Sequence, residues 1–105
     1  MNGFQLTLFL RQDDKHGHQP MSQWLVAVAK RLGIGGATVI AAAEGFGHGG
    51  RLHSAHFFEL ADQPVELTMA LSAADAGRVF ELLKSVGVDL FYLMAPIEFG
   101  MTGQR

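Results

Sequence analysis

The stretch GIGGATVIAAAEGFGHGG, residues 33–50, decides the fold, because glycines gather at both ends of a short apolar run. The run predicts a strand over about residues 36–44, and the glycines that follow allow backbone conformations that other residues avoid. Glycines at a strand end also leave backbone N–H groups unobstructed, and such groups bind anions where they converge. No Gly-Lys-Ser/Thr sequence or helix signal follows Gly50, so binding of phosphate at a helix N-terminus does not apply.

The first part of the chain alternates between strand and helix patterns. Residues 4–11 alternate apolar and polar side chains, which predicts a strand. A charged, glycine-containing loop follows over residues 11–19. Apolar residues then recur at helical spacing after Pro20, and Gly33 is placed to end the helix. This apolar stripe consists of Met21, Trp24, Leu25, Val28 and Leu32.

The second part repeats this layout. Residues 55–60 and 65–71 predict one long strand with a bend or bulge at residues 61–64, or a strand extended by a short hairpin. Ser72 is placed to cap a second helix, which Gly87 ends. A last strand is predicted from Val88 to about Ala95, where Pro96 indicates an edge or an exit from the sheet. The apolar stripe of the second helix consists of Ala76, Val79, Phe80 and Leu83.

The resulting order, βαββαβ, predicts an α+β fold. We expect a ferredoxin-like sandwich in which two helices cover one face of an antiparallel sheet. A length of 105 residues fits a single domain, residues 1–105.

A family resemblance lies in the same glycine-flanked stretch. Gly36-Ala37-Thr38-Val39, followed by Glu44-Gly45-Phe46-Gly47, resembles the second strand and T-loop entry of the PII signalling proteins. It is still more similar to a PII-like family of unknown function, domain of unknown function 190, in which an Arg-x-His segment follows. Arg51-Leu52-His53 stands at that place here.

The resemblance implies a nucleotide sensor. In PII proteins the residue matched by Thr38 contacts the adenine of a nucleotide between subunits, and those matched by Gly45, Phe46 and Gly47 line the same cleft. Arg51, which follows this motif in the sequence, is the best local candidate for a cation that binds the phosphates. The residues alone leave other interpretations open: Thr38 also suits a strand, Phe46 also suits a hydrophobic plug, and an arginine on a glycine-rich loop is commonly solvated.

The resemblance also implies a function, although the chain departs from the PII pattern in its cations. It implies a non-enzymatic signalling protein whose glycine-rich T-loop, expected to be mobile over residues 47–54 without ligand, regulates a partner such as a membrane transporter or channel. PII proteins carry further basic residues after the second helix and near the C-terminus, where this chain offers Lys84 and Arg105. Because each buried phosphate charge needs a donor, AMP or ADP is expected before ATP.

Histidines supply an alternative function. His48, His53 and His56 lie on or beside the glycine loop, and the divalent-cation-tolerance proteins share the expected fold. A trimer axis can gather one imidazole per subunit around a transition metal. Against this, His53 and His56 on one strand project to opposite faces, and the sequence offers no compact set of histidine and carboxylate ligands.

Composition excludes several classes of protein. The chain has no cysteine, so disulfides and thiolate chemistry are excluded. Its formal net charge of −2 does not indicate nucleic-acid binding, and no signal segment or apolar span is present, so a cytoplasmic protein is expected. No catalytic motif is present, and Glu44 with His53 across a hairpin is explained more simply as a structural or solvated pair.

The last predicted strand indicates a contact with another subunit. Residues 90–95 are apolar on both strand faces, whereas two helices cover only one face of a sheet. An exposed face that carries Phe9, Phe91 and Leu93 is an apolar patch of the kind that marks a partner surface. The alternative is a strand that is buried on both faces within the monomer. Since PII-like proteins are trimers with their sheets packed inward, we expect a homotrimer.

Overall fold

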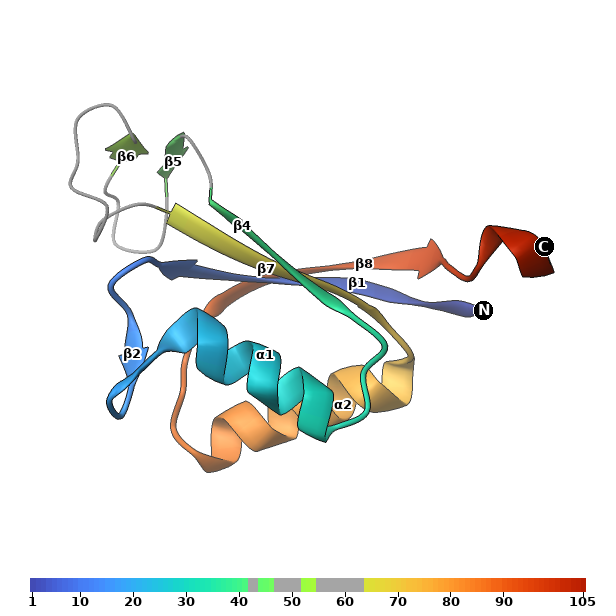
Figure 1. The fold of residues 1–105 in the computed structure, drawn as a ribbon, viewed down its shortest axis with the longest axis horizontal. Helices are drawn as coiled ribbons and strands as arrows, with labels where there is room; N and C mark the ends of the chain where they lie inside the picture. Colours follow the sequence, from blue (N-terminus) through green and yellow to red (C-terminus); the bar gives the residue numbers. More distant parts are fainter. Residues whose placement is uncertain (42–43, 47–51, 55–63) are drawn as a thin grey trace.

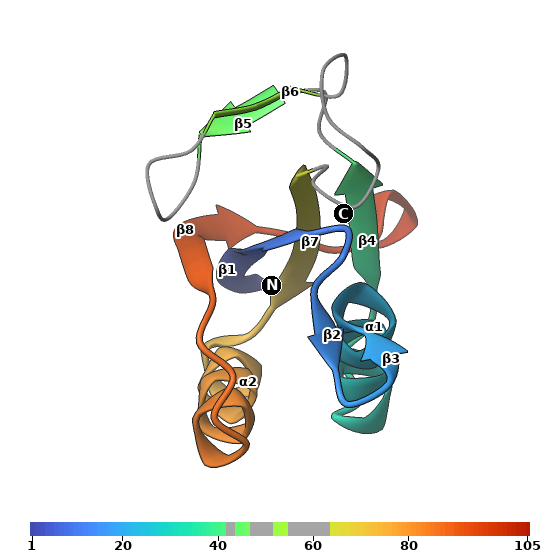
Figure 2. The same cartoon turned by 90° about the vertical axis from the view of Figure 1, so that its left-hand side faces the viewer.

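The computed structural model describes residues 1–41, 44–46, 52–54 and 64–105. Its main sheet has four antiparallel strands in the order β4-β7-β1-β8: β4 is Ala37–Ala41, β7 is Pro64–Leu71, β1 is Asn2–Arg11 and β8 is Phe91–Glu98. Helices α1 (Met21–Arg31) and α2 (Ala73–Ser85) lie together on one side of this sheet (Figures 1 and 2). The predicted ferredoxin-like sandwich is confirmed.

The register of the sheet separates its two faces. Val39, Leu67, Leu8 and Tyr92 lie opposite one another across all four strands. Leu67 and Leu8 are fully buried in the core beneath the helices, so this row belongs to the helix-covered face. The next row, Thr38, Thr68, Thr7 and Leu93, therefore belongs to the opposite face, which we call the open face.

The core lies between the helices and the sheet. It joins alternate residues of β1 and β7 to the apolar stripes of both helices. Each large side chain buried there contributes roughly 1.5–3 kcal/mol to stability. The largest fully buried side chains are Leu6, Leu8, Leu67, Val65 and Val79.

The start of α2 and the ends of both helices lie where local sequence signals predict them. The Ser72 hydroxyl oxygen accepts a hydrogen bond from the N–H of Asp75 at 3.1 Å and so caps α2, as predicted. Gly33 (φ 77°) and Gly87 (φ 74°) adopt the left-handed conformation just after α1 and α2. Arg78 of α2 donates to the carbonyl oxygen of Leu32 at 2.9 Å, which links α2 to the end of α1.

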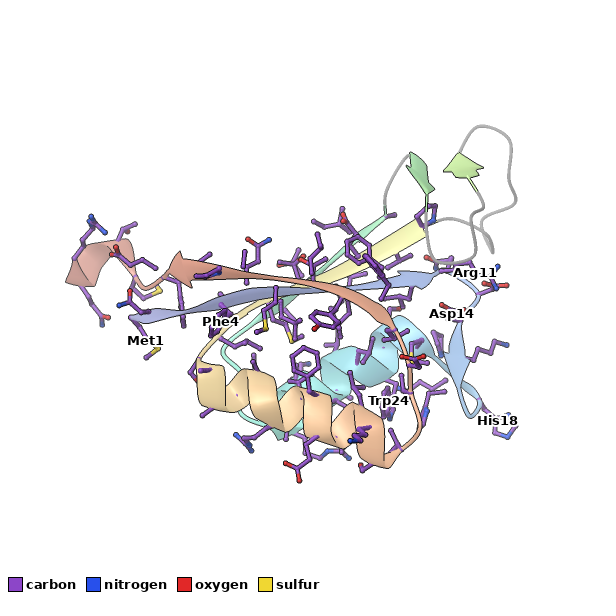
Figure 3. The ribbon with its side chains drawn as sticks, turned by 180° about the vertical axis from the view of Figure 1, so that it is seen from behind. Met1, Phe4, Arg11, Asp14, His18 and Trp24 are labelled. Carbon is purple, nitrogen blue, oxygen red and sulfur yellow. The ribbon has the colours of Figure 1, made fainter. Side chains whose placement is uncertain are left out.

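The charged segment after β1, predicted to be a loop, contains a small hairpin. Strands β2 (Lys15–His16) and β3 (Gln19–Pro20) pair beside α1. The imidazole of His16 stacks on the indole of Trp24, with ring centroids 3.9 Å apart. At the start of the segment, the Asp14 carboxylate accepts a hydrogen bond from the N–H of Arg11 at 2.8 Å, and Figure 3 shows the two residues together.

The predicted bounds of two strands were wrong. The second strand ends at Ala41, and Glu44 begins a separate strand, β5 (Glu44–Phe46), which pairs with β6 (Leu52–Ser54). The last strand begins at Phe91 and continues through Pro96 to Glu98. It begins late because the N–H of Val88 bonds to the carbonyl of Leu83 at 2.9 Å and completes the end of α2.

The long third strand is described only in part. Its predicted segment 55–60 lies outside the described residues. Pro64, expected within the interruption, is instead the first residue of β7 and pairs with Arg11. A strand tolerates proline at this position, where its missing N–H disrupts the ladder least.

Candidate functional site

Of the predicted site residues, Thr38 is the one for which the structure describes the strand, the exposure and the cross-strand partner. It is the second residue of β4, an outer strand, and its side chain is exposed. Across the open face it lies opposite Thr68, which in turn lies opposite Thr7. The hydroxyls of Thr7 and Thr68 are 3.2 Å apart and share a hydrogen bond. Thr38 therefore extends a row of hydroxyl groups to the edge of the sheet.

Gly45 and Phe46 lie on β5, in the hairpin that follows β4 along the chain. The backbone of Gly45 lies opposite His53, and that of Phe46 lies opposite Leu52. In both views the hairpin lies on the side of the main sheet away from the helices (Figures 1 and 2). The motif that follows Thr38 in sequence thus stands on the same side as the open face.

The remaining candidate residues are not tested by the described structure. Gly47, Arg51, His48 and His56 lie outside the described residues, and so does most of the segment 47–54 expected to be mobile. His53 belongs to β6, and its backbone is described. Glu44 pairs with Ser54 and Gly45 pairs with His53, so Glu44 and His53 are not directly opposite each other in the hairpin.

The structure describes Lys84 and Arg105, the two basic residues that the resemblance to PII proteins singled out. Arg105 donates to the Glu98 carboxylate at 2.7 Å in an exposed ion pair. Lys84 stands in the last turn of α2 with an exposed side chain. Within the described ranges, no three histidine, cysteine or acidic side chains are grouped so that they could hold a metal ion.

The described surface also contains a shallow, open cavity of about 460 Å³ that the sequence did not predict. Phe4, Ala73 and Pro96 contribute to its lining, where β1 and β8 pass the start of α2. It is mainly apolar and does not include Thr38. No sequence motif marks this cavity, because its lining comes from three separate elements.

The open face carries the apolar patch that the sequence predicted. Phe91 and Leu93 are 54% and 57% exposed, and Phe9 packs on Phe91 with ring centroids 5.5 Å apart. Ile40 lies opposite Glu66 in the same cross-strand row as Phe9 and Phe91, and is 47% exposed. The helices do not cover any of these side chains, since they lie on the other face.

The fold is that of the PII-like proteins, a βαββαβ sandwich in which β4 carries Ala37, Thr38 and Val39 directly after Gly36. The chain belongs to the DUF190 family, described as "Uncharacterized ACR, COG1993", whose profile matches residues 3–99.

Solved structures share this fold at low sequence identity. CPII, a nitrogen regulatory PII-like protein from Thiomonas intermedia K12 bound to ADP, AMP and bicarbonate, matches with a TM-score of 0.71 at 17% identity, over 96% of this chain and 91% of CPII. Its apo form matches with a TM-score of 0.64 at 14% identity, over 96% and 95% of the two chains. A putative PII-like signaling protein from Thermus thermophilus matches with a TM-score of 0.65 at 18% identity, over 91% and 87%.

The two helices of the main fold are short. Among the residues described, neither α1 nor α2 has the length and apolar character that a membrane-spanning helix requires.

Proposed function

We propose that this protein is a PII-like sensor that binds AMP or ADP between the subunits of a homotrimer. The observation that carries the proposal is the position of Thr38, exposed at the outer edge of the open face just before the hairpin that holds Gly45 and Phe46. CPII, which shares the fold, was obtained with ADP, AMP and bicarbonate bound. Thr38 contacts the adenine, and the backbone of residues 45–47 with Arg51 approaches the phosphates.

The scarcity of available cations supports a ligand with few phosphates. Of the two basic residues that the resemblance to PII proteins singled out, Arg105 forms an exposed ion pair with Glu98, and Lys84 is exposed in the last turn of α2. Each further phosphate adds negative charge that needs a charged or backbone donor. AMP and ADP are therefore bound more tightly than ATP.

Ligand binding is read out by the glycine-rich T-loop. A ligand shifts a loop only when it interacts differently with the loop's two states, and backbone N–H groups that meet phosphate supply that difference. The ordered loop changes its contact with a cytoplasmic surface of a partner, such as a membrane transporter or channel. The protein acts by binding and not by catalysis.

Calorimetry on the purified protein tests the choice of ligand. AMP, ADP, ATP, cyclic AMP, zinc and copper are titrated separately, with bicarbonate present and absent. We expect saturable binding of AMP or ADP at one site per subunit and weaker binding of ATP. Saturable binding of zinc or copper without any nucleotide would favour the histidine alternative, and no binding of either class at millimolar concentration would leave a structural adaptor.

A further inference from the structure

The β2–β3 hairpin carries a ring contact that the proposed function does not use. The imidazole of His16 stacks on the indole of Trp24, with ring centroids 3.9 Å apart and 28° between the ring planes. Both side chains are partly buried. Imidazole is the side chain whose charge ordinarily changes between pH 5 and 8, so the strength of this contact can depend on pH.

A tight turn fixes the position of His16. His16 lies directly opposite Gln19, so Gly17 and His18 form a two-residue turn. Gly17 has φ 64°, a left-handed conformation that such turns require and that glycine adopts without strain. His18 is exposed at the tip of the hairpin, whereas His16 lies against Trp24 of α1 (Figure 3).

Asp14 joins both ends of the hairpin segment to the main fold. Its N–H donates to the carbonyl oxygen of Arg11 at 3.1 Å, and its carboxylate accepts from the N–H of Arg11 at 2.8 Å. Its own carbonyl oxygen accepts from the N–H of Met21, the first residue of α1, at 2.8 Å. Between these fixed ends, the stack of His16 on Trp24 joins the hairpin to the side of α1.

The charged groups of the hairpin segment compete little with the indole for His16. Lys15 precedes His16 on β2, and neighbouring side chains of a strand point to opposite faces. The two nearby carboxylates pair with Arg11, whose Nε is 3.5 Å from Asp13 and 3.8 Å from Asp14.

The charges of α1, against which the hairpin packs, are also distant from His16. The first turn of α1 has no acidic residue, and its two cations, Lys30 and Arg31, lie in its last turn. The positive end of the helix dipole opposes a charge on His16, but this effect falls off within the first turn, which Trp24 ends. The indole in direct contact is therefore the main group that acts on the charge of the imidazole.

We propose that the β2–β3 hairpin is a pH-sensitive latch, in which protonation of His16 tightens the docking of the hairpin on α1. A cation over the face of an indole is attracted by the quadrupole of the ring, and tryptophan is the best partner for such a contact. A neutral imidazole keeps only the weaker stacking of two rings. This response to pH goes beyond the proposed nucleotide sensor and requires no ligand.

The direction of the response follows from the two states of the hairpin. In the docked state the imidazolium lies over the indole, and in the released state water alone solvates it. Protons are therefore bound more favourably in the docked state, and by linkage acid favours docking. Docking is strongest at the acidic end of the range and weakens as pH rises and His16 loses its charge.

The emission of Trp24 tests the latch, because the chain has a single tryptophan. The full-length protein is titrated from pH 8 to pH 5.5 without nucleotide. We expect the emission to fall on acidification, since an imidazolium in contact with an indole quenches its fluorescence. His16→Gln keeps a planar side chain that cannot become charged, and it should abolish the pH dependence. His18→Gln is the matched control in the same turn and should retain it.

Quenching by acrylamide measures docking separately from the charge. The bimolecular quenching constant of Trp24, corrected for fluorescence lifetime, should fall on acidification in the unsubstituted protein and in His18→Gln. The fall is limited to the change in the docking equilibrium that a cation–π contact supplies at an exposed site, about 2- to 5-fold. His16→Gln should show no such fall.

Emission that does not change with pH, or that changes equally in His16→Gln, would overturn the proposal. So would a quenching constant that stays constant or rises on acidification, because the hairpin would then not dock more tightly. A proton NMR titration of the unsubstituted protein needs no variant: the His16 imidazole and the Trp24 emission should share one midpoint, and different midpoints would contradict the latch. None of these results depends on whether a nucleotide binds.

Discussion

Thr38 is the single side chain on which the nucleotide proposal depends most. Its hydroxyl is exposed and lies at the edge of the sheet, whereas Thr7 and Thr68 bond to each other further in. Thr38→Ala removes one hydrogen bond, whose net value is about 0.5–1.5 kcal/mol, so AMP or ADP should bind about 2- to 10-fold more weakly by calorimetry. Thr38→Ser keeps the hydroxyl and is the matched control.

The histidines provide the contrasting variant. His53→Ala with His56→Ala should leave nucleotide affinity unchanged, since neither residue is assigned a nucleotide contact. If this double variant abolishes nucleotide binding while Thr38→Ala does not, the assignment of the adenine contact is wrong.

Two glycines, one within α2 and one just after it, are expected to respond oppositely to alanine. Gly87 has φ 74°, and a left-handed backbone costs other residues about 1–2 kcal/mol, so Gly87→Ala should destabilise the fold by that amount. Gly77 lies within α2 in open space without a positive φ, so Gly77→Ala should stabilise by about 0.5–1 kcal/mol. Urea unfolding measures both changes, and shifts of the same sign would contradict this account of the backbone.

At the scale of secondary structure, the Ser72 cap fixes the start of α2. Ser72→Ala removes the acceptor for the N–H of Asp75 and should lower the free energy of unfolding by about 1 kcal/mol. Ser85→Ala is the control, because the Ser85 hydroxyl donates to the Leu82 carbonyl at an exposed position in the last turn of the same helix. An exposed change of that kind should stay within about 0.5 kcal/mol. Equal destabilisation by the two variants would mean that the cap has no special role.

The sequence predicted the helices better than the strand boundaries. Ser72, Gly33 and Gly87 act on their own helix ends, so their signals can be read locally. The start of β8 depends on the Val88–Leu83 hydrogen bond, and its end depends on pairing of Glu98 with Asn2. Neither of these is visible in hydropathy, since apolar residues from 88 onward suit both a strand and a helix end.

In the candidate site, too, the sequence predicted features that depend on local residues but not those that depend on distant segments. The motif placed Thr38 on a strand, but its position opposite Thr68 on the open face depends on the register between β4 and β7. The cavity beside Phe4, Ala73 and Pro96 could not be predicted, because three segments distant in sequence form it.

At the scale of the whole molecule, the exposed apolar side chains of the open face support the proposed homotrimer. Phe91, Leu93 and Ile40 are exposed in the single chain, and burying such side chains is favourable in proportion to the apolar area removed from water. Light scattering at micromolar concentration should give three times the mass of the 11.4 kDa chain. A monomer under these conditions would contradict the assembly.

The assembly should also depend on the apolar side chains of the open face. Leu93→Glu places a charge on the open face, which the proposed trimer buries, and a buried unpaired charge is costly, so a trimer should dissociate into folded monomers. Glu81→Lys changes an exposed charge on the helix side and should leave the trimer intact. Light scattering and circular dichroism together separate dissociation from unfolding.

Hydrogen exchange of residues 47–54, with and without saturating ADP or AMP, tests the central claim most directly. Three glycines in these eight residues make ordering costly in entropy, so their amides should exchange rapidly without ligand. Contacts of the backbone with phosphate should slow that exchange, while exchange in α1 and α2 changes little. If these amides are already protected without ligand, or if a saturating nucleotide leaves their exchange unchanged, the nucleotide-driven switch is contradicted.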